Sequence, residues 1–108
     1  MYEYRAYVKK VYDGDTVTLD IDLGFGIIIK NQKVRLLGIN APEIRGSSRD
    51  LGLKSRDFLR KKILKNWVVL KTKKDKKGKF GRWLGNLSLE NVDINELMIK
   101  EGFAKKYE

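Results

Sequence analysis

The 108-residue sequence predicts a mainly β fold of the α+β class: a five-stranded barrel with one internal amphipathic helix and a C-terminal helix. Two observations carry this prediction. Apolar residues alternate with a period of two through much of the first half, as in half-buried strands, and the period becomes helical near the middle. The length allows one modest hydrophobic core, so we expect residues 1–108 to form a single domain.

The first half indicates a series of antiparallel strands. An Asp13-Gly14 turn signal separates two alternating apolar sets, which is the pattern of a hairpin. These sets are Tyr4, Ala6 and Val8 before the turn and Val17, Leu19 and Ile21 after it. A second turn is expected over residues 23–26. The aliphatic runs 27–29 and 34–39 are typical of well-buried strands, with residues 30–33 as a polar interruption.

The second half predicts a helix, two more strands and a closing helix. Phe58, Leu59 and Ile63 fall at helical spacing, so residues 52–65 should form an amphipathic helix. Strands are expected over 67–70 and 82–89, joined by a lysine-rich hairpin with its turn at 77–78. Asp93 has the spacing of a helix N-cap before a short helix that Gly102 can close. This set of elements fits an OB-type barrel, a common nucleic-acid-binding scaffold.

Charge and composition narrow the function classes. The chain has 24 Lys and Arg against 14 Asp and Glu, and its net charge of +10 concentrates polyanions such as DNA or RNA, although a merely basic protein has the same balance. The absence of cysteine excludes disulfides. No run approaches the ~20 apolar residues of a membrane span, so no membrane partner is expected. Residues 1–5 lack a signal-peptide pattern, which predicts an intracellular protein or a mature secreted form.

Two acidic clusters indicate oxygen-ligand chemistry. Residues 13–16 read DGDT and residues 40–43 read NAPE, in a chain without histidine or cysteine, so any bound metal must be a hard ion. Asp15, the side-chain oxygen of Asn40 and the backbone oxygen of Ala41 could form part of a calcium shell. Glu43 could take a proton from a nearby water. Taken alone, an Asp-Gly pair is more often an ordinary turn, and Glu43 a polar loop residue.

Two arginines could complete a phosphate site. Arg35 and Arg82 each present a planar fork of donors that matches phosphate oxygens. Arg35 lies inside an apolar strand run, and a buried arginine needs an anionic partner or a ligand. Arg82 follows Gly81 and precedes Trp83, so it could instead stack on an aromatic surface. A metal, a base and an arginine clamp are the parts that phosphodiester hydrolysis needs.

Three sequence blocks carry a resemblance to a known family. They are residues 11–17 (VYDGDTV), 34–43 (VRLLGINAPE) and 79–85 (KFGRWLG), and residues 95–104 add a closing-helix segment. In this order they resemble the signature blocks of the micrococcal (staphylococcal) nuclease family, also called thermonucleases. The resemblance implies an OB-fold barrel and a calcium-dependent phosphodiesterase. Such an enzyme cuts DNA and RNA endonucleolytically and leaves 5′-hydroxyl and 3′-phosphate ends.

The same resemblance implies roles for individual residues. The implied catalytic residues are the general base Glu43 and the phosphate-gripping Arg35 and Arg82. The implied calcium ligands are Asp15, Asn40 and the backbone of Ala41. The implied substrate-binding residues are Lys79, Phe80 and Leu84. The residues that would support the metal loop are Asp13 and Thr16.

The chain departs from the best-known family members at three of these positions. Those members carry aspartate, threonine and tyrosine where this chain has Asn40, Ala41 and Phe80. Asn40 leaves the site with one negative charge fewer, which predicts weaker calcium binding. Alanine keeps its backbone oxygen, whereas phenylalanine lacks a hydroxyl that could touch phosphate.

The competing interpretation is a nuclease-like barrel that has lost catalysis and keeps a basic surface for nucleic acid or a protein partner. The joint presence of Asp15, Arg35, Glu43 and Arg82 favours the enzyme, because a pure binding domain has no need of carboxylates where a polyanion docks. We therefore expect a nuclease that acts on DNA, RNA or both, uses Ca²⁺ and is a monomer.

Overall fold

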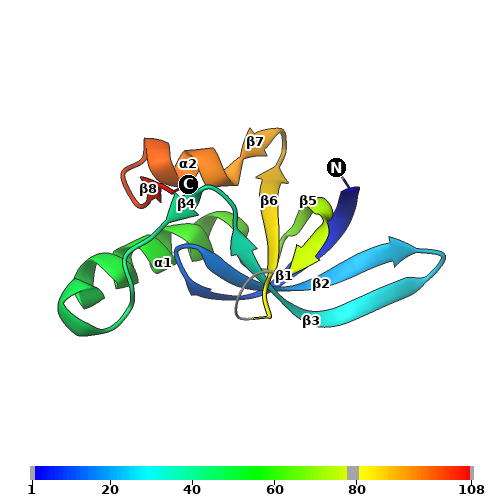
Figure 1. The fold of residues 1–108 in the computed structure, drawn as a ribbon, viewed down its shortest axis with the longest axis horizontal. Helices are drawn as coiled ribbons and strands as arrows, with labels where there is room; N and C mark the ends of the chain where they lie inside the picture. Colours follow the sequence, from blue (N-terminus) through cyan, green and yellow to red (C-terminus); the bar gives the residue numbers. More distant parts are fainter. Residues whose placement is uncertain (1, 78–80, 108) are drawn as a thin grey trace.

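The computed structural model of the chain describes residues 2–77 and 81–107. Its elements, in chain order, are β1 (Tyr2–Asp13), β2 (Thr16–Gly24), β3 (Ile27–Leu36), β4 (Ile39–Asn40), a 3-10 helix (Gly46–Ser48), α1 (Arg49–Ile63), β5 (Trp67–Lys77), β6 (Trp83–Leu89), β7 (Val92–Asp93), α2 (Ile94–Lys100) and β8 (Lys105–Lys106). Both α-helices lie at the opposite end of the molecule from the tip of the β2–β3 hairpin (Figure 1).

Five strands of the described residues close into a barrel. β1 pairs with β2 and β5, β2 pairs with β3, and β5 pairs with β6, all antiparallel. A parallel pairing of β3 with β6 completes the ring and sets Arg35 opposite Leu84. This arrangement confirms the predicted five-stranded OB-type barrel with an internal and a C-terminal helix. It also brings the end of β3 beside the start of β6, which are far apart in the sequence.

The barrel interior and the inner faces of the helices form the hydrophobic core. Strand side chains alternate between two faces, so the even-numbered Ala6 and Val8 and the odd-numbered Val17 and Leu19 all lie inside, each fully buried. The helices add Leu59 and Ile63 from α1 and Ile94 and Met98 from α2, each at most 2% exposed. Burying a side chain of this size stabilises a fold by about 1.5–3 kcal/mol. Both helices are therefore fixed on the barrel, together with the loops that they flank.

The prediction that residues 27–29 are well buried is wrong. Ile27, Ile28 and Ile29 are 55%, 45% and 40% exposed, and Phe25 at the adjoining turn is 102% exposed. The β2–β3 hairpin extends beyond the barrel (Figure 1), and β3 continues through residues 30–33 without the expected interruption. A β-branched run favours an extended backbone whether or not another layer covers it. Here the described chain places no layer over the hairpin tip.

The helices are confirmed, although α1 begins three residues before the predicted range and ends at Ile63 rather than at residue 65. α1 begins at Arg49 rather than at residue 52, because the 3-10 turn of residues 46–48 leads directly into it. α2 begins as predicted, since the Asp93 side chain accepts a hydrogen bond from the backbone N–H of Glu96. Gly102 ends the helix in a left-handed conformation, with φ +79°, and donates its N–H to the Ile99 carbonyl at 3.0 Å.

Short strand pairs complete the structure. β4 pairs with β8, and β6 pairs with β7, and neither two-residue partner was predicted. Of the strands around the lysine-rich hairpin, β5 is longer than expected and runs to Lys77, whereas β6 covers the expected range except for residue 82. The predicted turn at 77–78 extends beyond the described residues. Across the described ranges, no helix is both long and apolar enough to cross a membrane.

Candidate functional site

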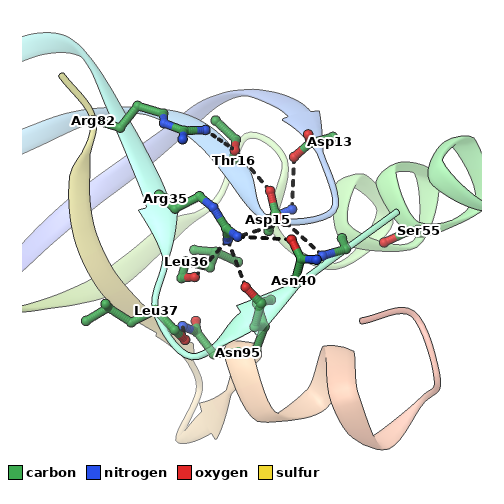
Figure 2. Close-up of polar contacts among 12 residues, drawn as sticks. Asp13, Asp15, Thr16, Arg35, Leu36, Leu37, Asn40, Ser55, Arg82 and Asn95 are labelled. Atoms are coloured by element: carbon green, nitrogen blue, oxygen red, sulfur yellow. Dashed lines mark hydrogen bonds and ion pairs between the residues drawn. The ribbon is translucent and has the colours of Figure 1, made fainter. Parts of the chain in front are cut away.

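Asp15 lies at the centre of a polar network in the turn between β1 and β2 (Figure 2). The residue is buried, with 5% of its surface exposed. One oxygen, Oδ1, accepts from the Thr16 hydroxyl at 3.1 Å, and Oδ2 accepts from the backbone N–H of Ala41 at 2.8 Å. The Asp15 N–H in turn donates to Asp13 Oδ1 at 3.0 Å. The two acidic clusters of the sequence are thus joined directly, across a separation of 26 residues.

Arg35 of β3 reaches into this network from the barrel wall. Its Nη1 lies 3.3 Å from Asp15 Oδ2 and donates to the carbonyls of Leu36 at 3.1 Å and Ile39 at 2.9 Å. Its Nη2 donates to Asn40 Oδ1 at 3.3 Å. The guanidinium is therefore the cation on which the oxygens of Asp15 and Asn40 converge (Figure 2). The arginine expected to need an anionic partner has one in Asp15.

Arg82 approaches the same network from the other side. It directly precedes β6, and its Nη1 donates to the Thr16 hydroxyl at 3.4 Å. Thr16 therefore connects Arg82 to the carboxylate of Asp15. The parallel β3–β6 pairing produces this proximity, because the two strands run side by side from Val34 and Trp83 onward. Leu84 is half-buried opposite Arg35.

Glu43 follows β4 in the loop that leads to α1, and its side chain is exposed. Its backbone carbonyl accepts from the Ser48 hydroxyl at 3.1 Å. A polar depression of about 370 Å³ brings Glu43 together with Arg82 and Asp13 among its lining residues. A carboxylate that can accept a proton and a guanidinium that can bind phosphate thus face one concave surface.

Two close approaches hold the Glu43 loop and the Asp15 turn on α1. Gly52 packs so tightly that a Cβ there would collide with the Glu43 carbonyl oxygen. A Cβ on Gly14 would meet the hydroxyl of Ser55 and would lie 2.7 Å from the Cβ of Ala41. Only glycine fits at these two positions without a shift of the backbone. Sequence reasoning treated Gly14 as a turn signal alone; the small residues at 52 and 55, three apart on one helix face, were the available sign of this contact.

Burial raises the pKa of the Asp13 carboxyl from 3.8 to about 6, with further contributions from a hydrogen bond to Asp15 and from the neighbouring Asp15 charge. Folding therefore favours the protonated form of Asp13. The stabilisation that protonated Asp13 gives the folded state is complete below about pH 4 and is lost as the pH rises through about 6. At neutral pH the turn therefore holds two carboxylates close together, an arrangement that a cation would relieve.

The donor set fits a hard cation. Among the described residues, no group of three or more His, Cys, Asp or Glu side chains could hold a metal ion. A metal ion at this site would therefore need amide and backbone oxygens and water beside the Asp15 carboxylate, a set that suits calcium. The convergence of Asp15 and Asn40 on the Arg35 guanidinium shows that their oxygens can face a common positive charge.

Comparison with known proteins places this network in a family. A family model described as "Staphylococcal nuclease homologue" matches residues 33–108. The chain belongs to the staphylococcal nuclease family. The chain is 31% identical to a thermonuclease of Staphylococcus hyicus over 106 residues, covering 95% of the chain and 59% of that protein. It is 31% identical to a thermonuclease of Staphylococcus intermedius over 101 residues, covering 91% and 56%.

A third relative has a different size. The chain is 28% identical to "Endonuclease YhcR" of Bacillus subtilis over 116 residues, covering 97% of the chain and 9% of that protein. The chain thus spans less than two thirds of the length of each of these curated relatives. The family match at residues 33–108 includes Arg35, Asn40, Glu43 and Arg82. Asp15 precedes the matched residues; it contacts Arg35 directly and Arg82 through Thr16.

The candidate substrate residues of this family member are only partly described. Lys79 and Phe80 lie outside the described residues. Two further residues contact this network, although no residue pattern predicted these contacts. Buried Asn95 of α2 donates to the Leu37 carbonyl at 2.8 Å and so supports the turn between Arg35 and Asn40. Tyr107 places its ring 5.9 Å from the Arg35 guanidinium, because its N–H donates to the Gly38 carbonyl beside the β4–β8 pair.

Proposed function

We propose that this member of the staphylococcal nuclease family is a calcium-dependent endonuclease that hydrolyses phosphodiester bonds of DNA, RNA or both. The convergence of Arg35 with the oxygens of Asp15 and Asn40, beside the depression that Glu43 and Arg82 line, carries this proposal. A phosphodiester carries one negative charge, gains charge during hydrolysis and needs an activated water. The site offers cations, oxygen ligands and a carboxylate within one small region.

Calcium would be held by the side-chain oxygens of Asp15 and Asn40 and by the backbone oxygen of Ala41, completed by water. When bound, it would supply positive charge for the phosphate oxygens. Asp13 and Thr16 support this arrangement, since each makes a hydrogen bond to Asp15. Arg35 already contacts Asp15 Oδ2 and Asn40 Oδ1, so a bound metal would compete with the guanidinium for these oxygens.

The protein side chains divide the reaction between them. Glu43 takes a proton from a water molecule, whose oxygen then attacks the phosphorus. Arg35 and Arg82 donate to the non-bridging oxygens, where charge accumulates in the transition state. The bond from phosphorus to the 5′ oxygen breaks, and that oxygen leaves and takes up a proton. The products are a 3′-phosphate and a 5′-hydroxyl.

The net charge of +10 favours a polyanionic substrate. Lys79 is proposed to contact the phosphate next to the scissile one. Phe80 can offer only apolar contact there, since it lacks a hydroxyl, and Leu84 would form part of the same surface. If the chain instead bound nucleic acid without cutting it, it would represent the binding-domain alternative, with Asn40 in place of a charged ligand as the favouring observation.

Incubation of labelled single-stranded DNA and RNA with the protein tests the proposal. We expect cleavage with calcium, none with chelator, and little with magnesium, whose tight octahedral shell suits loop donors poorly. The ends can be identified by polymerase extension, which should require prior removal of the 3′-phosphate. Cleavage in chelator, equal rates in magnesium, or products that extend directly would contradict the proposed chemistry. Binding without cleavage would support the alternative.

Asn40→Asp is expected to lower the calcium concentration for half-maximal cleavage on the order of tenfold, because a charged ligand replaces a neutral one at a hard-ion site. Thermal shift of the protein titrated with calcium should report the same change without substrate. Asn91→Asp in the exposed β6–β7 turn adds the same charge elsewhere and is the matched control. An unchanged midpoint for Asn40→Asp would place Asn40 outside the calcium shell.

A further inference from the structure

A second hollow adjoins the depression that holds Glu43. It has a volume of about 690 Å³ and shares Tyr12, Ile44 and Arg82 with that depression. We call it the basic groove, defined by Lys10, Tyr12, Lys33, Arg56, Arg60 and Arg82. No carboxylate is among the described residues that line it. A polymer bound at the candidate site could therefore continue into it.

Lys10 and Lys33 supply the uncompensated charge of the basic groove. Both are exposed, and Lys10 of β1 and Lys33 of β3 lie opposite Thr18 of β2 from its two sides. With neighbouring strands about 4.8 Å apart, the two residues stand roughly 10 Å from one another across the sheet. Neither forms an ion pair within the described part of the chain. Both ammonium groups are thus available to an external anion.

The arginines of the basic groove are more constrained. Arg56 pairs with Asp57 at 3.1 Å, and Arg60 donates to the Val11 carbonyl at 3.3 and 3.2 Å through Nε and Nη2. The Arg60 contacts tie α1 to β1, whereas the Arg56 pair lies within α1. Lys10 and Lys33, on the sheet side of the basic groove, are therefore the cations that are most available to bind a phosphate.

Tyr12 stands where the basic groove meets the Glu43 depression. It is 49% exposed, and its hydroxyl accepts from Arg45 Nη2 at 2.9 Å. The ring is thus held at its polar end while much of the residue remains accessible. An aromatic ring in this position can stack with a nucleobase, and such stacking tolerates any base.

We propose that the basic groove is a strand-binding subsite, in which the base next to the scissile phosphate stacks on Tyr12 and the following phosphates lie along Lys10 and Lys33. The inference rests on the proposed nuclease function. It assigns a binding surface to the part of the strand on one side of the scissile phosphate. The ligand is an unpaired polynucleotide segment, since a paired base has no free face for the ring. The protein should then have a higher kcat/KM for polynucleotides than for dinucleotides.

Comparison of a labelled single-stranded 12-mer with a dinucleotide tests the subsite. We measure the ratio of kcat/KM for the 12-mer to that for the dinucleotide, which can reach the Glu43 depression and Tyr12 but has no further phosphates for Lys10 and Lys33. Lys10→Glu with Lys33→Glu is expected to lower this ratio about tenfold or more, mainly through KM for the 12-mer. Lys61→Glu with Lys100→Glu makes the same charge change at exposed positions outside the basic groove and should keep the wild-type ratio.

Tyr12 is tested by separating ring from hydroxyl. Tyr12→Leu removes the ring and should lower kcat/KM about tenfold for both substrates, whereas Tyr12→Phe keeps the ring and should restore most of it. If Tyr12→Leu equals wild type, or if both pairs of lysine substitutions lower the ratio alike, the basic groove is only part of a diffuse positive field and the proposal is overturned.

Binding in chelator separates this proposal from the proposed function. Fluorescence anisotropy of the 12-mer should give a Kd about tenfold higher for the Lys10/Lys33 pair than for the Lys61/Lys100 pair, with a shallower dependence on salt. A protein that cleaves neither substrate would refute the nuclease function, and the anisotropy would still decide on the subsite. Equal Kd values for the two pairs would overturn the subsite even if cleavage is normal.

Discussion

Arg35→Ala is expected to lower kcat by about 10²–10³-fold and, at the same time, to tighten calcium binding. The loss of rate follows because the guanidinium would bind the phosphate most strongly as charge builds up on its oxygens. The gain in affinity follows because Arg35 Nη1 now lies 3.3 Å from Asp15 Oδ2 and Nη2 donates to Asn40 Oδ1. Removal of this cation leaves both oxygens to the metal.

Turnover of single-stranded DNA and calorimetric calcium titration without substrate measure the two effects separately. Arg35 also donates to two backbone carbonyls, so thermal melting must accompany them. Arg35→Lys keeps the positive charge but lacks the paired donors of the guanidinium. It should therefore restore the wild-type calcium affinity more fully than the wild-type kcat. Arg5→Ala removes an arginine that stacks over Trp67 and serves as the control. Weaker calcium binding in Arg35→Ala would show that Arg35 orders the ligands instead of competing for them.

Glu43→Gln is expected to lower kcat by about 10²–10⁴-fold while calcium affinity changes little. Glutamine preserves the shape of the side chain but cannot accept the proton. The backbone of Glu43 is held in place, because the Ser48 hydroxyl donates to its carbonyl and Gly52 packs against the same carbonyl. A general base held in this way should act at one place in the depression that it shares with Arg82.

The calcium dependence of the rate distinguishes a base from a metal ligand. If Glu43 is the base, the loss of kcat in Glu43→Gln should persist at saturating calcium. Glu101→Gln, an exposed change at the end of α2, is the control for charge. A Glu43→Gln protein that regains full rate at high calcium would show that Glu43 binds the metal.

Residue patterns predicted local structure well wherever the cause is local. The Asp13-Gly14 turn, the alternation on either side of it and the Asp93 cap each depend on neighbours within a few residues, and the structure contains all three. The same reasoning failed for Ile27, Ile28 and Ile29, because backbone preference is a local property and burial is not. An extended run needs a second layer to become core, and only the packed molecule decides whether that layer exists.

The sequence by itself determined which chemical groups are present: oxygen donors without soft ligands, two arginine forks, a net charge of +10 and the blocks that resemble the nuclease family. Their meeting was decided by tertiary structure. Arg82 reaches Thr16 across 66 residues because β3 and β6 pair in parallel, and Ala41 donates to Asp15 because Gly14 lets the turn approach Ser55 of α1. Pairings so far apart in sequence depend on barrel closure and on the close packing of the whole chain, which residue patterns do not specify.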